Sequence, residues 1–325
     1  MTESAIAVDL GGTNIRAAMV GRDGRIEGVV TRGTGAGEGP EAVIDRIVAL
    51  VSEVVNGAQP APEVKVGVVA PGPLNPFTGV VYFGPNLPGW HDVPLRDILR
   101  QRLNRDVVIG NDANSAALGE VMFGAARQVR HLVYLALGTG VGGGIVSHGH
   151  LIEGIRGVGG EVGHVSIDPS GPRCHCGGIG CVEAYVGGWA IARDGEMLIR
   201  SSRSSAIETA ARGSPVTAEV VAEAARAGDE AARGVFQRAG QALAVGIAGL
   251  VNIFNPELIV IGGGLAAVEG LLLDPLRESL PRYAMAQIHP DATIRRSALG
   301  GNTGLFGAAA RVFYHEQTSN ALLEP

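Results

Sequence analysis

Residues 5–20 read AIAVDLGGTNIRAAMV, which is two apolar runs separated by a glycine turn. Each run has the length and composition of a buried β-strand, and the pair Gly11-Gly12 marks a tight turn between them. Asp9 stands near the end of the first run, and Thr13 follows the glycines. The stretch therefore predicts a β-hairpin whose turn places a carboxylate and a hydroxyl beside accessible backbone amides.

The chain on either side of this hairpin alternates between strand-like and helix-like segments. Residues 131–146, HLVYLALGTGVGGGIV, repeat the pattern of strand, glycine turn and strand. Recurrence of the same pattern indicates a weak internal duplication and the α/β class, with one domain built on each hairpin. The other expected strands are 26–31, 65–70, 107–109 and 258–262, and the expected helices are 41–55, 216–227, 230–253 and 303–314.

Composition narrows the functional classes. The chain has 325 residues, 46% hydrophobic and 18% charged, which is typical of a soluble globular protein with two cores. A net charge of −6 argues against nucleic acid or an anionic membrane as the main partner. No apolar run reaches the roughly 18 residues that span a bilayer, and the N-terminus lacks a basic signal region. We therefore expect a cytoplasmic protein.

Two common nucleotide-binding motifs do not fit the chain. Lys65 is the only lysine and has no Gly-Lys-Ser/Thr context, which excludes a P-loop. Residues 138–143 satisfy G-x-G-x-x-G, but residues 144–147 continue as a strand where a dinucleotide site needs a helix.

The glycine turns offer other ways to hold a nucleotide. Glycine amides and the Thr13 hydroxyl are suitable donors to phosphate oxygens, and Asp9 is suited to holding Mg²⁺ directly or through water. A plain hairpin is the alternative reading of this turn. A third cluster, IVIGGG at 259–264, is either a structural strand-to-helix turn or backbone that lies against adenosine.

All three cysteines fall within eight residues, as Cys174, Cys176 and Cys181. In a cytoplasmic protein such a cluster indicates a metal site before a disulfide. Tetrahedral Zn²⁺ needs a fourth ligand, for which His164 and His175 are the nearby candidates. A site closed by four protein ligands is structural.

Carboxylates and polar side chains gather near predicted strand ends and near the cysteines. Asp112 follows the strand 107–109 and precedes an alanine-rich segment, so it lies where open α/β sheets bind ligands. The alternative is that Asp112 only caps the following helix. Glu161, His164 and Glu183 flank the cysteine loop and form a polar set suited to sugar hydroxyls.

These motifs resemble the ROK family (repressor, open reading frame, kinase) over essentially the whole chain. The most specific match is GH at 163–164 followed, nine residues later, by CHCGGIGCVE at 174–183. The stretches LGTGVGGG at 137–144 and GEVGH at 160–164 are also similar to the family's motifs. The chain differs at Gly187-Gly188, because family members often have a serine before the glycine, and this leaves the contacts of that segment open.

The resemblance implies an actin-like (ribonuclease H-like) ATPase fold, with two α/β domains around a central cleft. It implies a smaller N-terminal domain of residues 1–112 plus 303–325 and a larger one of residues 113–302 that carries the zinc loop. Asp112 would be the general base. The other implied roles are sugar binding by Gly72, Asn86, Asn111, Asp112, Glu161, His164 and Glu183; binding of ATP and Mg²⁺ by Asp9, Gly11, Gly12, Thr13, Thr139, Gly140, Gly262 and Gly263; and structural Zn²⁺ binding by His164, Cys174, Cys176 and Cys181.

The implied reaction is transfer of the γ-phosphoryl group of ATP to a hexose, in a homodimer or homotetramer without nucleic-acid or membrane partners. NLPGW at 86–90 and IRG at 155–157 resemble the bacterial glucokinases of this family. N-acetylmannosamine, fructose and allose kinases share nearly the same motifs, and polyphosphate is an alternative donor. Some members are repressors with an N-terminal DNA-binding segment, whereas here the first expected strand begins by about Ser4.

Overall fold

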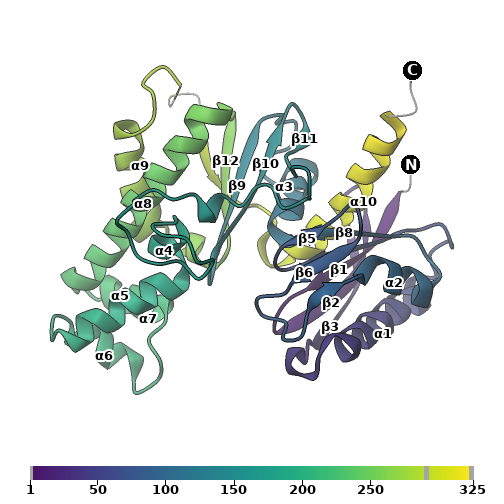
Figure 1. Ribbon diagram of the computed structural model, residues 1–325, viewed down its shortest axis with the longest axis horizontal. Helices are drawn as coiled ribbons and strands as arrows, with labels where there is room; N and C mark the ends of the chain where they lie inside the picture. Colours follow the sequence, from purple (N-terminus) through teal and green to yellow (C-terminus); the bar gives the residue numbers. More distant parts are fainter. Residues whose placement is uncertain (1–2, 289–292, 322–325) are drawn as a thin grey trace. The chain divides into compact units, whose positions relative to one another are not determined.

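The computed structural model describes residues 3–288 and 293–321 (Figure 1). The chain divides into two compact units. The first contains Met1–Val129, Gly144–Gly160 and Ser297–Pro325, and the second contains Arg130–Gly143 and Glu161–Arg296.

The first unit is built on a five-stranded sheet in the order β3-β2-β1-β4-β8. The predicted hairpin is present as the antiparallel pair β1 and β2, with β3 antiparallel to β2. β4 and β8 extend the sheet in parallel with β1. The strands are β1 (Ser4–Leu10), β2 (Asn14–Gly21), β3 (Ile26–Gly33), β4 (Val66–Ala70) and β8 (Val107–Asn111).

Two hydrophobic cores cover the two faces of this sheet. One contains the apolar face of α1, whose buried positions Val43, Ile44, Ile47, Leu50, Val51 and Val54 follow the helical period. The other joins small residues of β1 and β2 to Leu305, Ala308 and Phe313 of α10. The helices are α1 (Pro40–Ala58), α2 (Leu95–Leu103), α3 (Asp112–Met122) and α10 (Thr303–Ala321), and a small sheet contains β5 (Leu74–Asn75), β6 (Val80–Phe83) and β7 (His91–Val93).

The second sheet repeats the strand order of the first. Its order is β11-β10-β9-β12-β13, with β9 parallel to β12 and β12 parallel to β13. The chain passes from the second unit into the first within β10. The strands are β9 (Leu132–Leu137), β10 (Val141–Ser147), β11 (His150–Leu151), β12 (Leu258–Gly262) and β13 (Thr293–Arg296). The matching strand orders confirm the predicted duplication.

Helices pack around the second sheet, and α8 is the longest of those described. By length and composition α8 would span a bilayer, but 67% of its most apolar window is buried within the protein. It contacts α4, α5, α7 and α9 of the same unit, as expected for the core helix of a globular domain. The helices are α4 (Glu183–Val186), α5 (Gly188–Arg200), α6 (Ser205–Ala211), α7 (Ala218–Arg226), α8 (Glu230–Phe254) and α9 (Glu269–Ser279).

Short 3₁₀ helices complete the described secondary structure. They are η1 (Ala36–Glu38), η2 (Val162–His164), η3 (Gly264–Ala267), η4 (Leu280–Arg282) and η6 (Gly300–Asn302). The most important for the site is η2, because its last residue is His164.

Candidate functional site

Parallel strands bring the predicted residues of the first unit to one edge of its sheet. β1, β4 and β8 run in the same direction, so their carboxyl ends meet at the same edge. The first glycine turn follows β1, Gly72 follows β4, and Asp112 follows β8. The sheet therefore places the candidate metal ligand, the candidate sugar loop and the candidate base on adjacent strands.

The first glycine turn is held by its own unit. The Gly11 amide donates to the carbonyl of Asn14 (2.9 Å), and the Thr34 hydroxyl donates to the carbonyl of Gly11 (2.6 Å). A Cβ at Gly12 would lie only 2.8 Å from the Cβ of Asn86. The predicted sugar residue Asn86 is thus packed directly against the predicted phosphate turn, which explains why glycine is needed there.

Asp9 is a partly buried carboxylate at the first turn of α10. A Cβ on Gly304 would collide with its carboxyl group, so only glycine allows this approach. Burial raises the pKa of Asp9, and the positive charge of Arg16 partly opposes that increase. Arg16 is itself anchored to the segment before α10, where it donates to the Asn302 side chain (2.7 Å).

The N-terminus of α3 fixes Asp112. Its N-cap is Asn111, whose side-chain oxygen accepts from the amides of Ala113 and Asn114, both at 3.0 Å. The N-cap is therefore Asn111, and the carboxylate of Asp112 also accepts from the Ala113 amide (2.8 Å). The Asn111 amide group also donates to the carbonyl of Gly72 (3.2 Å), which has a φ of 87°. Asp112 is exposed and is the first residue of the helix.

The polar residues predicted beside the cysteine loop lie together in the second unit. The Nε2 atom of His164 lies 3.9 Å from a carboxylate oxygen of Glu161. Partial burial raises the pKa of Glu161, the charge of His164 lowers it, and the charge of Glu183 raises it further. One Glu183 oxygen accepts from the amide of Val141 (2.9 Å), at the second glycine turn.

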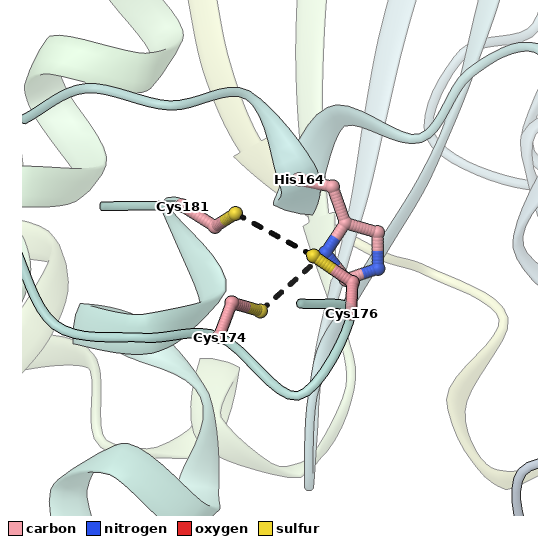
Figure 2. Close-up of side chains that lie close together, drawn as sticks. All are labelled: His164, Cys174, Cys176 and Cys181. Carbon is pink, nitrogen blue, oxygen red and sulfur yellow. Dashed lines mark hydrogen bonds between the residues drawn. The ribbon is translucent and has the colours of Figure 1, made fainter. Parts of the chain in front are cut away.

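The four predicted metal ligands converge (Figure 2). The candidate ligand atoms of His164, Cys174, Cys176 and Cys181 all lie within 4.8 Å of one another. The Sγ atoms of Cys176 and Cys181 are 3.7 Å apart, and Cys174 Sγ lies 3.7 Å from Nδ1 of His164. Tetrahedral zinc with bonds of about 2.3 Å places its sulfur ligands about 3.8 Å apart, so the donor set fits that ion.

The other candidate ligand, His175, is not part of this group. Its ring stacks on Trp189, with ring centroids 4.0 Å apart and planes inclined by 22°. Sequence reasoning did not find Trp189 as a residue of the site, because the contact depends on how the cysteine loop folds onto α5.

Glycines near the ends of β9 and β12 also approach one another. Gly262 pairs with Ala136 in the parallel ladder, and Gly263 has a φ of 84°. A Cβ at Gly263 would collide with the carbonyl of Leu137, immediately before the second glycine turn. The candidate phosphate residues Thr139 and Gly140 and the candidate adenosine residues Gly262 and Gly263 therefore occupy neighbouring strand ends.

The sequence model of the ROK family matches residues 5–313 of this chain. The chain belongs to the ROK family. It is 43% identical over 307 residues to a glucokinase from Thermotoga maritima, covering 94% of this chain and 96% of that protein. The solved ROK family glucokinase from Streptomyces griseus, in complex with glucose and AMPPNP, is 35% identical, with a TM-score of 0.79. The alignment covers 94% of this chain and 98% of that one, and this likeness confirms the actin-like fold expected from the sequence.

The ROK family also contains proteins of a different kind. A xylose repressor from Caldicellulosiruptor bescii is 31% identical over 311 residues, covering 95% of this chain but 78% of the repressor. Membership in the family therefore leaves both an enzyme and a regulator as candidate functions, and the residues of the site have to distinguish them.

Proposed function

We propose that this protein is an ATP-dependent hexose kinase that converts glucose and ATP to glucose 6-phosphate and ADP. The observation that carries the proposal is Asp112, an exposed carboxylate held at the end of β8 beside the Asn111–Gly72 hydrogen bond. Similarity to glucokinases over nearly the whole chain supports this reaction and sugar.

Asp112 acts as the general base. A sugar hydroxyl is a weak nucleophile, so a carboxylate that accepts its proton as the bond to phosphorus forms assists the attack. The amide of Ala113 donates to the Asp112 carboxylate (2.8 Å) and so orients it. Most of the remaining rate enhancement comes from alignment of the acceptor and the γ-phosphoryl group, and from neutralisation of phosphate charge.

The residues to which we assign sugar binding are polar or border a loop at a strand end. They are Asn86, Asn111 and the Gly72 loop, together with Glu161, His164 and Glu183. Carboxylates accept from sugar hydroxyls, whereas the amide groups of Asn86 and Asn111 both donate and accept. This mixture suits a ligand whose hydroxyl groups each donate and accept.

The nucleotide is held at the carboxyl ends of the strands. Backbone amides of Gly12 and Gly140 and the hydroxyls of Thr13 and Thr139 donate to phosphate oxygens, and Gly11 allows the backbone of the turn to approach them closely. Asp9 holds Mg²⁺, which supplies positive charge to the phosphates. Gly262 and Gly263 lie beside adenosine, where the absence of side chains allows close approach.

Zn²⁺ held by His164, Cys174, Cys176 and Cys181 is structural, since four protein ligands leave no open position. It supplies a fixed centre for the loop of residues 164–183. His164 would bind it through Nδ1, which lies 3.7 Å from Sγ of Cys174, and Nε2 would then remain on the side of Glu161.

The proposal also includes the domain boundaries, the assembly, the cellular location and the partners of the protein. The smaller domain is residues 1–112 plus 303–325 and the larger domain is residues 113–302. The enzyme is a cytoplasmic homodimer or homotetramer, and its partners are the sugar and ATP. Size-exclusion chromatography with light scattering tests the assembly. Hydrogen exchange with and without glucose tests the proposed domain boundaries.

The first experiment is an assay of the purified protein with Mg-ATP and a panel of hexoses. The panel contains glucose, mannose, fructose, allose and N-acetylmannosamine, and ADP release is followed with polyphosphate as a parallel donor. We expect glucose to give the highest kcat/KM. A higher value for another sugar would refute the glucose assignment and keep the kinase, whereas no phosphorylation of any sugar would favour the regulator.

A further inference from the structure

Residues 183–189 lie between the cysteine cluster and the second glycine turn and contact both. The Gly188 amide donates to the carbonyl of Gly138 (2.9 Å), and the Trp189 amide donates to the carbonyl of Thr139 (3.2 Å). With the Glu183–Val141 bond, three hydrogen bonds join this short segment to the turn. The turn is thus supported from outside its own hairpin.

Gly187 and Gly188 make this close approach possible. A Cβ at Gly187 would lie 3.1 Å from the carbonyl oxygen of Thr139, and one at Gly188 would lie 3.0 Å from that of Gly138. Both distances are shorter than ordinary van der Waals contact. The glycine pair at which this chain departs from the family pattern therefore allows its backbone to lie directly on the turn.

Glu183 connects the same segment to the cysteine cluster. One of its oxygens accepts from Val141, and the other lies 3.5 Å from Sγ of Cys174 and 3.4 Å from Nε1 of Trp189. A metal-bound Cys174 is a thiolate and donates no proton, so the indole N–H group of Trp189 is the side-chain donor that holds this oxygen. Movement of Trp189 would therefore change the position of the carboxylate and, through it, of the Val141 amide.

Trp189 makes a second connection, through its ring. It stacks on His175, which lies between two of the metal ligands, and the guanidinium carbon of Arg193 lies 5.4 Å from the ring centroid on the same helix. Stacked aromatic pairs contribute about 0.5–1.5 kcal/mol beyond the area they bury. The indole thus contacts the cysteine loop by its face and Glu183 by its N–H group.

We propose that Trp189 is a positioning residue that couples the cysteine loop to the phosphate-binding turn, so that metal occupancy sets the affinity for nucleotide as well as for sugar. This inference rests on the proposed function, because it takes residues 138–141 as the phosphate turn. It extends that function by assigning the zinc loop a role on the nucleotide side of the reaction.

Tryptophan fluorescence tests the coupling without catalysis. The chain has two tryptophans, and Trp90 is fully buried in the first unit. We expect removal of metal by a chelator to change the emission of the wild-type protein and to leave that of Trp189→Phe unchanged. The same change in both proteins would assign the signal to Trp90 and overturn the inference.

Nucleotide affinity tests the consequence. Trp189→Ala removes the stack and the indole donor, whereas Trp189→Phe keeps a ring and loses the donor. We expect the Kd for Mg-AMPPNP by calorimetry, and the KM for ATP, to rise about 10-fold in the alanine variant and about 3-fold in the phenylalanine variant. Met197→Ala, an exposed position on the same helix, is the control and should match the wild type.

The outcomes separate the inference from the proposed function. Wild-type affinity in both Trp189 variants would overturn the inference alone. If Met197→Ala shows the same loss of nucleotide affinity together with the same fall in Tm, the inference is also overturned, because the effect is then merely structural. If Trp189→Ala does not fold, the phenylalanine variant decides. Absence of Mg-AMPPNP binding by the wild-type protein would overturn the inference and the proposed function together.

Discussion

The two glycine turns occupy equivalent places in two sheets of the same strand order, yet they are held in different ways. The turn after β1 depends on short contacts within its own unit, from the Thr34 hydroxyl, Asn86 and Gly304. The turn after β9 depends on the carboxylate of Glu183, which also contacts the cysteine cluster. A repeated fold therefore supports one turn by a hydroxyl group and close packing, and the other by a charged group beside the cysteine cluster.

The largest expected effect tests whether the general base comes from the first sheet, which has a carboxylate at the end of its last strand. Asp112 follows β8, while the corresponding strand of the second sheet, β13, ends at Arg296. Asp112→Asn keeps the shape of the side chain and loses the base, so we expect kcat to fall about 10²–10⁴-fold with little change in KM. Asp106→Asn, at the opposite end of the same strand segment, is the control. A kcat within a few-fold of the wild type would remove Asp112 as the base.

The second effect concerns the cysteine cluster, which only the second turn has beside it. Cys176→Ser should lose the metal and raise the KM for glucose about 10–100-fold, because His164 and Glu183 lose their support. Elemental analysis and steady-state kinetics measure both quantities. Arg173→Ala, exposed in the same loop, should retain metal and wild-type kinetics. An unchanged KM in metal-free Cys176→Ser protein would show that the loop does not orient the sugar site.

A third prediction compares neighbouring glycines at the end of β12. Gly263→Ala would force a Cβ against the carbonyl of Leu137 at a positive φ, whereas Gly264→Ala meets no atom within 4 Å. We expect the first change to destabilise the protein by about 1–3 kcal/mol and the second to be nearly neutral. Chemical denaturation measures the difference. Equal stabilities would mean that the turn adapts freely.

The smallest effect concerns Asp9 in the first turn. Its pKa is raised mainly by burial, so the ionised carboxylate destabilises the folded protein at pH values above its folded pKa. Asp9→Asn should therefore slightly raise the Tm of the ligand-free protein at pH 7. The gain should disappear as the pH falls through the folded pKa, because wild-type Asp9 then takes up a proton.

Mg-ATP should oppose this gain in Tm. The Asp9→Asn variant offers no charge to Mg²⁺, so we expect the nucleotide to stabilise the variant less than the wild-type protein. Thermal unfolding at pH 7 and pH 5, with and without Mg-ATP, gives all four comparisons. A lower Tm for the ligand-free variant at pH 7 would contradict the expected role of burial.

Local patterns predicted most of the fold because the strands are short apolar runs and the long helices have strong 3.6-residue periods. The prediction missed the helices α2, α4, α5 and α6 and the short strands β5, β6, β7, β11 and β13. α4 and α6 have only 4 and 7 residues, and α5 begins in a glycine pair, so local signals for these three helices are weak.

Site geometry was predictable where one motif supplied it and not where distant segments meet. Three cysteines in one window indicated the cluster of candidate metal ligands, and the strand before Asp112 predicted its position at a sheet edge. The contact of Trp189 with His175 depends on the path of the loop between them, which residue spacing does not encode. The choice of Asn111 as N-cap was equally hidden, since both Asn and Asp are good caps.

The packing of α10 has a consequence for how the protein is made. Leu305, Ala308 and Phe313 complete a core with β1 and β2, which are synthesised almost 300 residues earlier. Residues 161–296 leave the ribosome before that helix, so the second unit can acquire most of its structure first. One apolar face of the first sheet stays uncovered until α10 has been synthesised. Nascent chains arrested after residue 296 should accordingly be cut by protease within residues 3–129 and resist cleavage within α8.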